Sequence, residues 1–163
     1  MAGDERMGEV ADGVRLQFRR RWLLPVADVW AGLTEPARLA RWIGTFDGPR
    51  VAGGAGTSTM THEDQPVGEP MRIVVCDAPA RLDVEWATEA GWRVELDLGR
   101  DGGETVLTST QVFAPGTDVV DHALGWHWYL DELDAEVGGR PEPGPWEVFL
   151  AETGSTYGRA PQT

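Results

Sequence analysis

The chain has 163 residues, of which 41% are hydrophobic, so it is long enough for one domain with a buried core and too short for two independent ones. Its 27 acidic residues against 14 basic ones give a formal charge of -13, which disfavours binding to nucleic acid or to an anionic membrane surface. No apolar run approaches the roughly 20 residues of a membrane span, and the amino-terminal residues lack the pattern of a secretory signal. We therefore expect a cytoplasmic protein.

The amino-terminal residues 1–13 are rich in glycine and acids without any period, which predicts a disordered tail. Apolar residues at every second position from Val14 to Trp22 then predict a strand with one buried face. Arg20 falls on that buried face. A buried guanidinium needs an acid or a polar group of a ligand as partner, unless a bulge returns the side chain to solvent.

Two short helices follow this strand. Pro25 can begin the first, and apolar residues then recur at helical spacing up to Leu33. Thr34 is suited to cap the second helix, and Gly44 is suited to end it. The glycine-rich stretch 45–70 indicates a weak strand pair with a mobile hairpin.

Four apolar-rich runs separated by turn residues come next, and they predict an antiparallel meander. The runs are Met71–Asp77, Arg81–Ala87, Trp92–Gly99 and Thr105–Phe113. Ser109 and Thr110 are neighbours in the last run, so one of them points to the apolar side and places a hydroxyl there.

A long helix is predicted after Asp118, which can cap its first turn. Apolar residues recur every three or four positions from Val119 to Val137, giving a helix of about 20 residues with one apolar face. The pair Gly138–Gly139 ends it. Residues 141–163 form an extension whose aromatic residues are expected to pack on the domain.

This order of elements predicts an α+β fold in which residues 14–140 form the domain. A curved antiparallel sheet of about six or seven strands wraps the long carboxy-terminal helix, because only that helix is long enough to cover the concave face. Two short helices follow the first strand. Where the helix and the curved sheet separate, we expect an apolar pocket.

Several segments resemble a known superfamily. They are the run LLPVADVWAGLTEPARLARWIG, the strand GGETVLTSTQVF and the helical GWHWYLDEL. Together they are similar to the START-like (SRPBCC) superfamily, and within it to the homologues of the activator of the heat-shock-protein-90 ATPase. The resemblance implies a helix-grip fold, whose members bind lipids, sterols or polyketides, cyclise aromatic precursors, or contact chaperones. It carries over no catalytic residue, because these members share no catalytic set.

Aromatic and polar residues on the predicted inner faces are the candidates for a ligand site. Flat side chains such as tryptophan suit flat apolar ligands, although each one taken singly could equally be ordinary core. The residues predicted to form the ligand site are Trp30, Trp86, Trp92, Trp126, His127, Ser109, Thr110 and Arg20.

The three histidines are candidates for catalytic or metal-binding groups. His127 lies one helical turn before Asp131, so it could be an oriented acid or base at the rim of the pocket, or a histidine on the flank of the helix. His122 lies one helical turn after Asp118 on the same helix, whereas His62 is expected in a solvated loop. The spacing of these residues does not fit a metal site, and Cys76 is expected to be an inert thiol.

The leading prediction is therefore noncatalytic binding of a small hydrophobic or aromatic molecule, with no catalytic set, metal or cofactor. A polyketide cyclase or hydrolase is the enzyme alternative, and it would need His127 or another inward polar group against the ligand. A chaperone-binding role is the second alternative, and it would need an apolar patch outside the pocket. The sequence leaves open whether the chain forms a homodimer.

Overall fold

The computed structural model describes residues 4–10, 13–88 and 91–157. Eight strands make up one sheet in this part of the chain. They are β1 (Asp4–Val10), β2 (Gly13–Trp22), β3 (Thr45–Asp47), β4 (Ala55–Thr59), β5 (Gly68–Asp77), β6 (Arg81–Trp86), β7 (Arg93–Asp101) and β8 (Glu104–Phe113). The helices are α1 (Val26–Thr34), α2 (Pro36–Trp42), α3 (Val120–Gly138) and α4 (Trp146–Thr153), followed by the short 3-10 helix η1 (Gly154–Tyr157).

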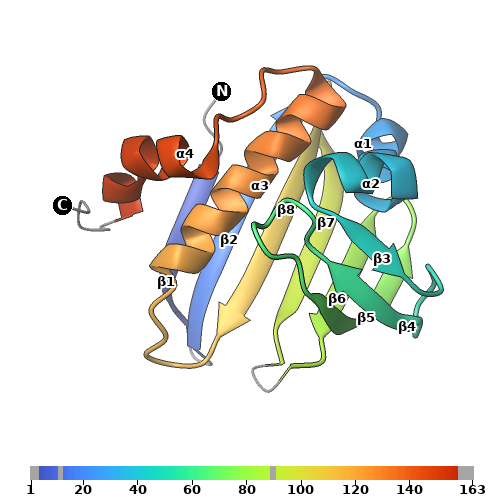
Figure 1. The fold of residues 1–163 in the computed structure, drawn as a ribbon. Coiled ribbons are helices and arrows are strands. Elements are labelled where there is room, and N and C mark those ends of the chain that lie inside the picture. Colours follow the sequence, from blue (N-terminus) through green and yellow to red (C-terminus); the bar gives the residue numbers. More distant parts are fainter. Residues whose placement is uncertain (1–3, 11–12, 89–90, 158–163) are drawn as a thin grey trace.

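The strands are ordered β1-β2-β8-β7-β6-β5-β4-β3, and every neighbouring pair is antiparallel. Strands that are neighbours in the sheet are also consecutive in sequence, except that β8 pairs with β2 (Figure 1). The first two strands of the chain therefore lie beside the last one. A bulge in β5 between Ile73 and Val75 bends this strand. The strands β3, β4 and β5 consequently curl toward the helices.

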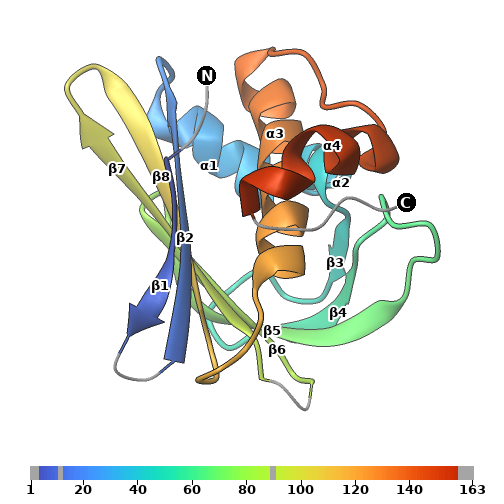
Figure 2. The same ribbon diagram turned by 90° about the vertical axis from the view of Figure 1, so that its left-hand side faces the viewer.

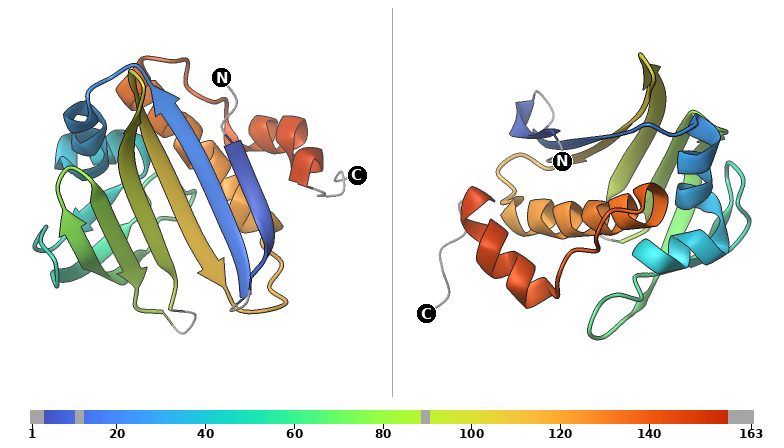
Figure 3. Two further views of the ribbon diagram at one scale, coloured as in Figure 1. Left: turned by 180° about the vertical axis from the view of Figure 1, so that it is seen from behind. Right: turned by 90° about the horizontal axis from the view of Figure 1, so that it is seen from above.

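All four helices lie on the concave side of the sheet, and α3 runs through the hollow of the curve (Figure 2). The opposite face is free of helices, as the view from behind shows (Figure 3). This arrangement confirms the predicted helix-grip fold, with two short helices after β2 and a long carboxy-terminal helix. The physical reason is that a strongly curved sheet needs an apolar rod to fill its concave face, and α3 provides it.

The packing of α3 follows from its sequence. Ala123, Leu130 and Leu133 recur at helical spacing and are at most 1% exposed, and Val119 precedes them in the same stripe. Burial of each such leucine contributes about 1.5–3 kcal/mol to the free energy of unfolding. The helix ends where Gly139 takes a left-handed conformation with φ of 64°, which is open to glycine at little cost.

The strand β2 has the expected two faces. Leu16, Phe18 and Trp22 are buried against the helices, while Arg15 is exposed on the outer face. The outer face is charged elsewhere as well. Asp83 on β6 is fully buried there because the arginines on either side cover it and donate hydrogen bonds of 2.9–3.1 Å to its carboxylate.

Two expectations were wrong, one about the amino-terminal residues and one about the start of α2. Disorder was expected for residues 1–13, but Asp4–Val10 form β1 and pair with β2 from Asp4–Arg19 to Val10–Gly13. Residues 1–3 and 11–12 lie outside the described part. Thr34 was expected to cap α2, whereas it is the last residue of α1 and its hydroxyl donates to the Trp30 carbonyl at 2.8 Å. The turn between α1 and α2 thus comes one residue later.

The carboxy-terminal segment packs on the outer side of α3. Phe149 of α4 and Tyr157 of η1 are buried in the same core cluster as Leu130 and Leu133 of α3. Figure 1 shows α4 on the side of α3 that faces away from β3 and β4. The segment therefore covers a part of α3 that the sheet does not reach.

Candidate functional site

Two neighbouring cavities lie between α3 and the concave face of the sheet. The inner cavity has a volume of about 430 Å³ and the outer cavity a volume of about 840 Å³. Ser58, Met60, Trp86 and Trp126 line both, so the two cavities border one another at these four residues. Both volumes fall in the range of about 300–1,000 Å³ that is usual for small-molecule sites.

The inner cavity is lined by residues of α1, α2 and α3 and of the inward faces of β3 to β8. Its wall is mostly apolar, and its aromatic and sulfur-containing members are Trp30, Trp42, Phe46, Met60, Met71, Cys76, Trp86 and Trp126. Arg50 also lines it, but its guanidinium is engaged by the carbonyls of Thr34 at 2.9 Å and Phe46 at 3.0 Å. The cavity thus offers dispersion contacts more than free polar partners.

The gap between helix and sheet divides the apolar interior into two clusters. One cluster contains Phe18, Leu130 and their neighbours on β2, β8 and the helices, and the other contains Phe46, Val84 and their neighbours on β3 to β7. The same five half-buried residues pack against both clusters: Trp30, Met60, Trp92, Leu96 and Trp126. Large apolar side chains at the centre of a fold are normally buried. These five remain accessible because they face the cavities.

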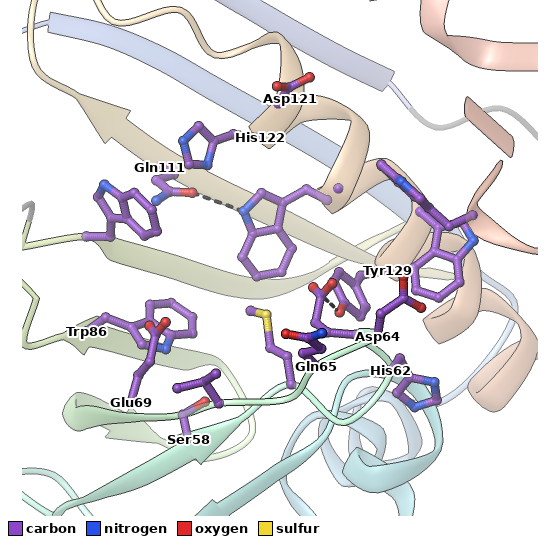
Figure 4. Close-up of a pocket in the computed structure, with 18 residues that line it drawn as sticks. Ser58, His62, Asp64, Gln65, Glu69, Trp86, Gln111, Asp121, His122 and Tyr129 are labelled. Atoms are coloured by element: carbon purple, nitrogen blue, oxygen red, sulfur yellow. Dashed lines mark hydrogen bonds between the residues drawn. The ribbon is translucent and has the colours of Figure 1, made fainter. Parts of the chain in front are cut away.

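The outer cavity lies between the start of α3, the inward face of β6 to β8 and the loop that joins β4 to β5. Five tryptophans and one tyrosine line it: Trp86, Trp92, Trp126, Trp128, Trp146 and Tyr129. Its polar lining residues are Ser58, His62, Glu63, Asp64, Gln65, Glu69, Gln111, Asp121 and His122. Figure 4 shows these side chains arranged around the opening.

Two hydrogen bonds fix aromatic side chains of α3 in this wall, and both are drawn in Figure 4. The indole N–H of Trp126 donates to the Gln111 side-chain oxygen at 3.0 Å, and the Tyr129 hydroxyl donates to Glu63 at 2.7 Å. Burial and the Glu63 hydrogen bond raise the pKa of Tyr129 far above its ordinary value, so the phenol stays protonated. The second bond also ties the β4–β5 loop to α3.

The chain was compared with known proteins. The family model described as "Activator of Hsp90 ATPase homolog 1-like protein" matches residues 23–138, which is more than half of the chain. The chain belongs to this family. The match spans α1 to α3 and therefore includes most of the walls of both cavities. Comparison with curated proteins gave no match.

Solved structures share the fold of this family member. The crystal structure of CalU16 from Micromonospora echinospora is 24% identical with a TM-score of 0.76, and the alignment covers 96% of each chain. The protein encoded by gene BPP1335 from Bordetella parapertussis is 25% identical with a TM-score of 0.76, over 95% of this chain and 90% of that chain. DynU16, from the dynemicin biosynthetic locus, is 22% identical with a TM-score of 0.64, over 81% of this chain and 49% of that chain.

The structure brings four of the predicted site residues together in this family member. Trp86 and Trp126 line both cavities, Trp30 lines the inner one and Trp92 lines the outer one. They come from α1, β6, the turn before β7 and α3. Strand alternation and helical spacing predict inward faces for these four residues, and each of them lines a cavity; their contact with a ligand stays a prediction.

His127 was predicted to lie at the pocket rim, and this prediction was wrong. It lines neither cavity and lies on the side of α3 that packs against α4 and η1. Its Nδ1 is 2.8 Å from the Tyr157 hydroxyl, and its Nε2 is 3.6 Å from Asp131. His122 lines the outer cavity instead. Five residues along a helix correspond to a rotation of about 140°, so the two histidines cannot face the same side.

Arg20, Ser109 and Thr110 also lie outside the lining of the two cavities. Arg20 does point inward, as predicted, and its partners are acids of α3: its Nη1 is 2.8 Å from Asp131 and 3.2 Å from Asp134. Ser109 is buried on the inward face of β8. Thr110 is on the outer face, where its hydroxyl accepts a hydrogen bond from Gln17 at 3.1 Å.

Sequence reasoning missed several lining residues. Gln111 is one of them, although it follows Ser109 by two positions and therefore shares its inward face. Trp128 and Trp146 are others, because they meet only when α4 folds back: the Trp128 indole donates to the Gly144 carbonyl at 3.1 Å, and its ring lies 6.1 Å from that of Trp146. Local sequence patterns do not predict such a contact between segments far apart in the chain.

Within residues 4–10, 13–88 and 91–157, His, Cys, Asp and Glu form no group of three or more that could hold a metal ion. In the same part of the chain, no helix is both long and apolar enough to cross a membrane.

The lowered pKa of His122 should make the free energy of unfolding depend on pH. Its ring packs between Trp92 at 4.9 Å and Phe113 at 4.7 Å, and burial lowers its pKa from the ordinary value of 6.5 although Asp121 opposes the shift. The unfolded chain then binds the proton first, so the free energy of unfolding is expected to fall as the pH drops below 6.5. Urea titrations across this range measure it. The variant His122→Gln should show a smaller decrease than the parent; an equal decrease would exclude His122 as a cause.

Proposed function

We propose that the protein binds a small hydrophobic molecule with an aromatic or similarly flat body, of lipid-, sterol- or polyketide-like character, in the inner cavity. The single observation that carries this proposal is an apolar cavity of about 430 Å³ between the sheet and α3, walled by Trp30, Trp42, Trp86 and Trp126. The structural neighbours contribute the fold alone. The cavity supplies the argument for binding.

Half-buried residues that pack against both core clusters make ligand binding energetically favourable. Trp30, Leu96 and Trp126 face the inner cavity and still expose apolar surface inside the fold. Each Å² of such surface that a ligand covers contributes about 25 cal/mol. An apolar molecule therefore completes the packing that the chain leaves unfinished, while rigid aromatic walls lose little entropy when they hold it.

The enzyme alternative has lost its main support. A cyclase or hydrolase needs an acid or base against the ligand, either His127 or another inward polar group, and His127 was the residue named for this role. It lies on the far side of α3 and contacts Phe149 and Tyr157. Binding without a defined catalytic set is therefore the function that the geometry supports best.

Cys76 offers a direct test, because it is the single cysteine of the chain and lines the inner cavity. We expect saturating naphthylmethanol, a neutral aromatic probe, to slow alkylation of Cys76 by N-ethylmaleimide at least about fivefold, since thiol reactivity depends on access. Mass spectrometry of the intact protein over time measures the rate. Tryptophan fluorescence supplies the dissociation constant in the same buffer.

A glutathione thiol in the same solution is the control for direct effects of the probe on the reagent. The proposal predicts protection that follows the fluorescence binding curve. Unchanged alkylation of Cys76, together with unchanged fluorescence across neutral aromatic and aliphatic probes, would overturn it. Native mass spectrometry of the protein purified from its own host would then identify any retained molecule by mass.

A further inference from the structure

The outer cavity combines aromatic rings with negative charge. Its wall contains the indoles of Trp86, Trp92 and Trp126 and the phenol of Tyr129, which is the kind of surface that attracts cations through the ring faces. Four carboxylates line the same cavity: Glu63, Asp64, Glu69 and Asp121. The inner cavity is also walled by aromatic rings, but within the described part of the chain its acidic lining residue is Glu35 alone.

The carboxylates surround the cavity and come from three separate segments. Figure 4 shows Glu69 on β5 beside Ser58 and Trp86, Asp64 on the β4–β5 loop near Tyr129, and Asp121 at the start of α3. Among the described residues that line the outer cavity, none is an arginine, and the chain contains no lysine. A bound anion would therefore meet carboxylates without a guanidinium or ammonium partner in the wall.

One of the two histidines of the wall, His122, does not offset this charge at neutral pH. Burial lowers the pKa of His122, so its ring is mainly neutral there. His62 makes a contact of 3.1 Å to the carbonyl of Ala40 through its Nε2. The cavity thus keeps an excess of negative charge next to aromatic faces.

We infer that the ligand of this protein is a cationic amphiphile, with an alkylammonium group in the outer cavity and an apolar body that passes between Met60, Trp86 and Trp126 into the inner cavity. This inference rests on the proposed function and names the ligand class. The two cavities border on the same four side chains, so we place the ammonium group in one cavity and the apolar body of the same molecule in the other. Ring faces and carboxylates then bind the ammonium group together, while the apolar wall binds the body.

Three probes with one apolar body test the charge preference. They are naphthylmethylammonium, neutral naphthylmethanol and anionic naphthoate, and tryptophan fluorescence or calorimetry gives each dissociation constant. We expect the ammonium to bind at least about tenfold more tightly than the alcohol, which corresponds to about 1.4 kcal/mol, and naphthoate to bind most weakly. The advantage of the ammonium should shrink when NaCl rises from about 50 to about 300 mM, because salt screens exposed charges.

A variant with Asp64→Asn, Glu69→Gln and Asp121→Asn distinguishes the local wall from the charge of the whole molecule. Its matched control carries Asp28→Asn, Asp47→Asn and Asp97→Asn, three exposed acids that line neither cavity. Both variants change the net charge equally. Only the first is expected to weaken naphthylmethylammonium about tenfold while naphthylmethanol binds as before.

The outcomes separate this inference from the function on which it rests. Binding of naphthylmethanol with equal or tighter binding of naphthoate would overturn the cationic class and leave the proposed hydrophobic site intact. An equal loss of ammonium binding in both variants would also overturn it, since the global field would then suffice. If neither neutral nor charged probe binds, the proposed function itself fails.

Discussion

Replacement of Arg20 by methionine is expected to lower the free energy of unfolding by about 3–5 kcal/mol. The Arg20 side chain is 3% exposed and its Nη1 contacts Asp131 at 2.8 Å and Asp134 at 3.2 Å, so it joins β2 to α3 through the core. Methionine fills similar space but leaves Asp134, which is 7% exposed, with one cation fewer. Arg140, at 3.1 Å from Asp134, keeps the expected loss near the lower end of that range.

The pH dependence of this loss provides a second readout. Burial already raises the pKa of Asp134, and Arg20 and Arg140 oppose this rise. Without Arg20 the folded-state pKa rises further, so the destabilisation is present at neutral pH and becomes smaller as acid protonates Asp134. Urea titrations near neutral pH and in mild acid measure both quantities.

The matched control is Arg15→Met, because Arg15 is exposed on the outer face of β2. It should change the free energy of unfolding by no more than about 0.5 kcal/mol. A loss below about 1 kcal/mol for Arg20→Met would contradict the interpretation, since that is the contribution of an exposed ion pair.

Substitution of Leu96 by tryptophan should weaken binding of naphthylmethanol at least about a hundredfold, or about 2.8 kcal/mol. Leu96 lies on the central strand β7, lines the inner cavity and packs against both core clusters. It is half-buried, so a larger ring can extend into the cavity and occupy the volume that a ligand would fill. Overpacking should cost no more than about 1–3 kcal/mol of stability.

The control for this variant is Val112→Trp, which adds an indole on the outer face of β8, where Val112 is 46% exposed. Its affinity for naphthylmethanol should match that of the parent. Fluorescence titration measures binding and urea titration verifies that both variants are folded. Unchanged affinity in folded Leu96→Trp would place the binding site outside the inner cavity.

Local sequence patterns were sufficient to predict which side chains of β2 and α3 face inward. Alternation in β2 placed Arg20 on the buried face, and the helical stripe of α3 placed Trp126 toward the sheet, because side-chain periods of two and 3.6 residues are properties of the backbone. The same reasoning applied to strand β8 would have found Gln111. The prediction that His127 lies at the pocket rim was wrong because residues that are adjacent in sequence point to different sides of a helix, and Trp126 and His127 are adjacent.

β1 escaped prediction for a different reason. Asp4–Val10 carry no alternating apolar pattern, and they form a strand because the backbone of β2 offers a free edge for pairing. Such pairing depends on a partner that exists only once the neighbouring strand has formed. The same holds for Trp146, which joins the wall of the outer cavity only after α4 folds back onto α3.

The sequence by itself determined the helix-grip fold, the apolar face of α3 and four of the tryptophans that line the cavities, since each follows from local periodicity. Only the tertiary structure decided that Arg20 is paired with Asp131 and Asp134, that His122 instead of His127 faces the outer cavity, and that four carboxylates gather around aromatic rings. These features depend on contacts between segments far apart in the chain. The free energy of such contacts is set by distance and burial, which local sequence does not contain.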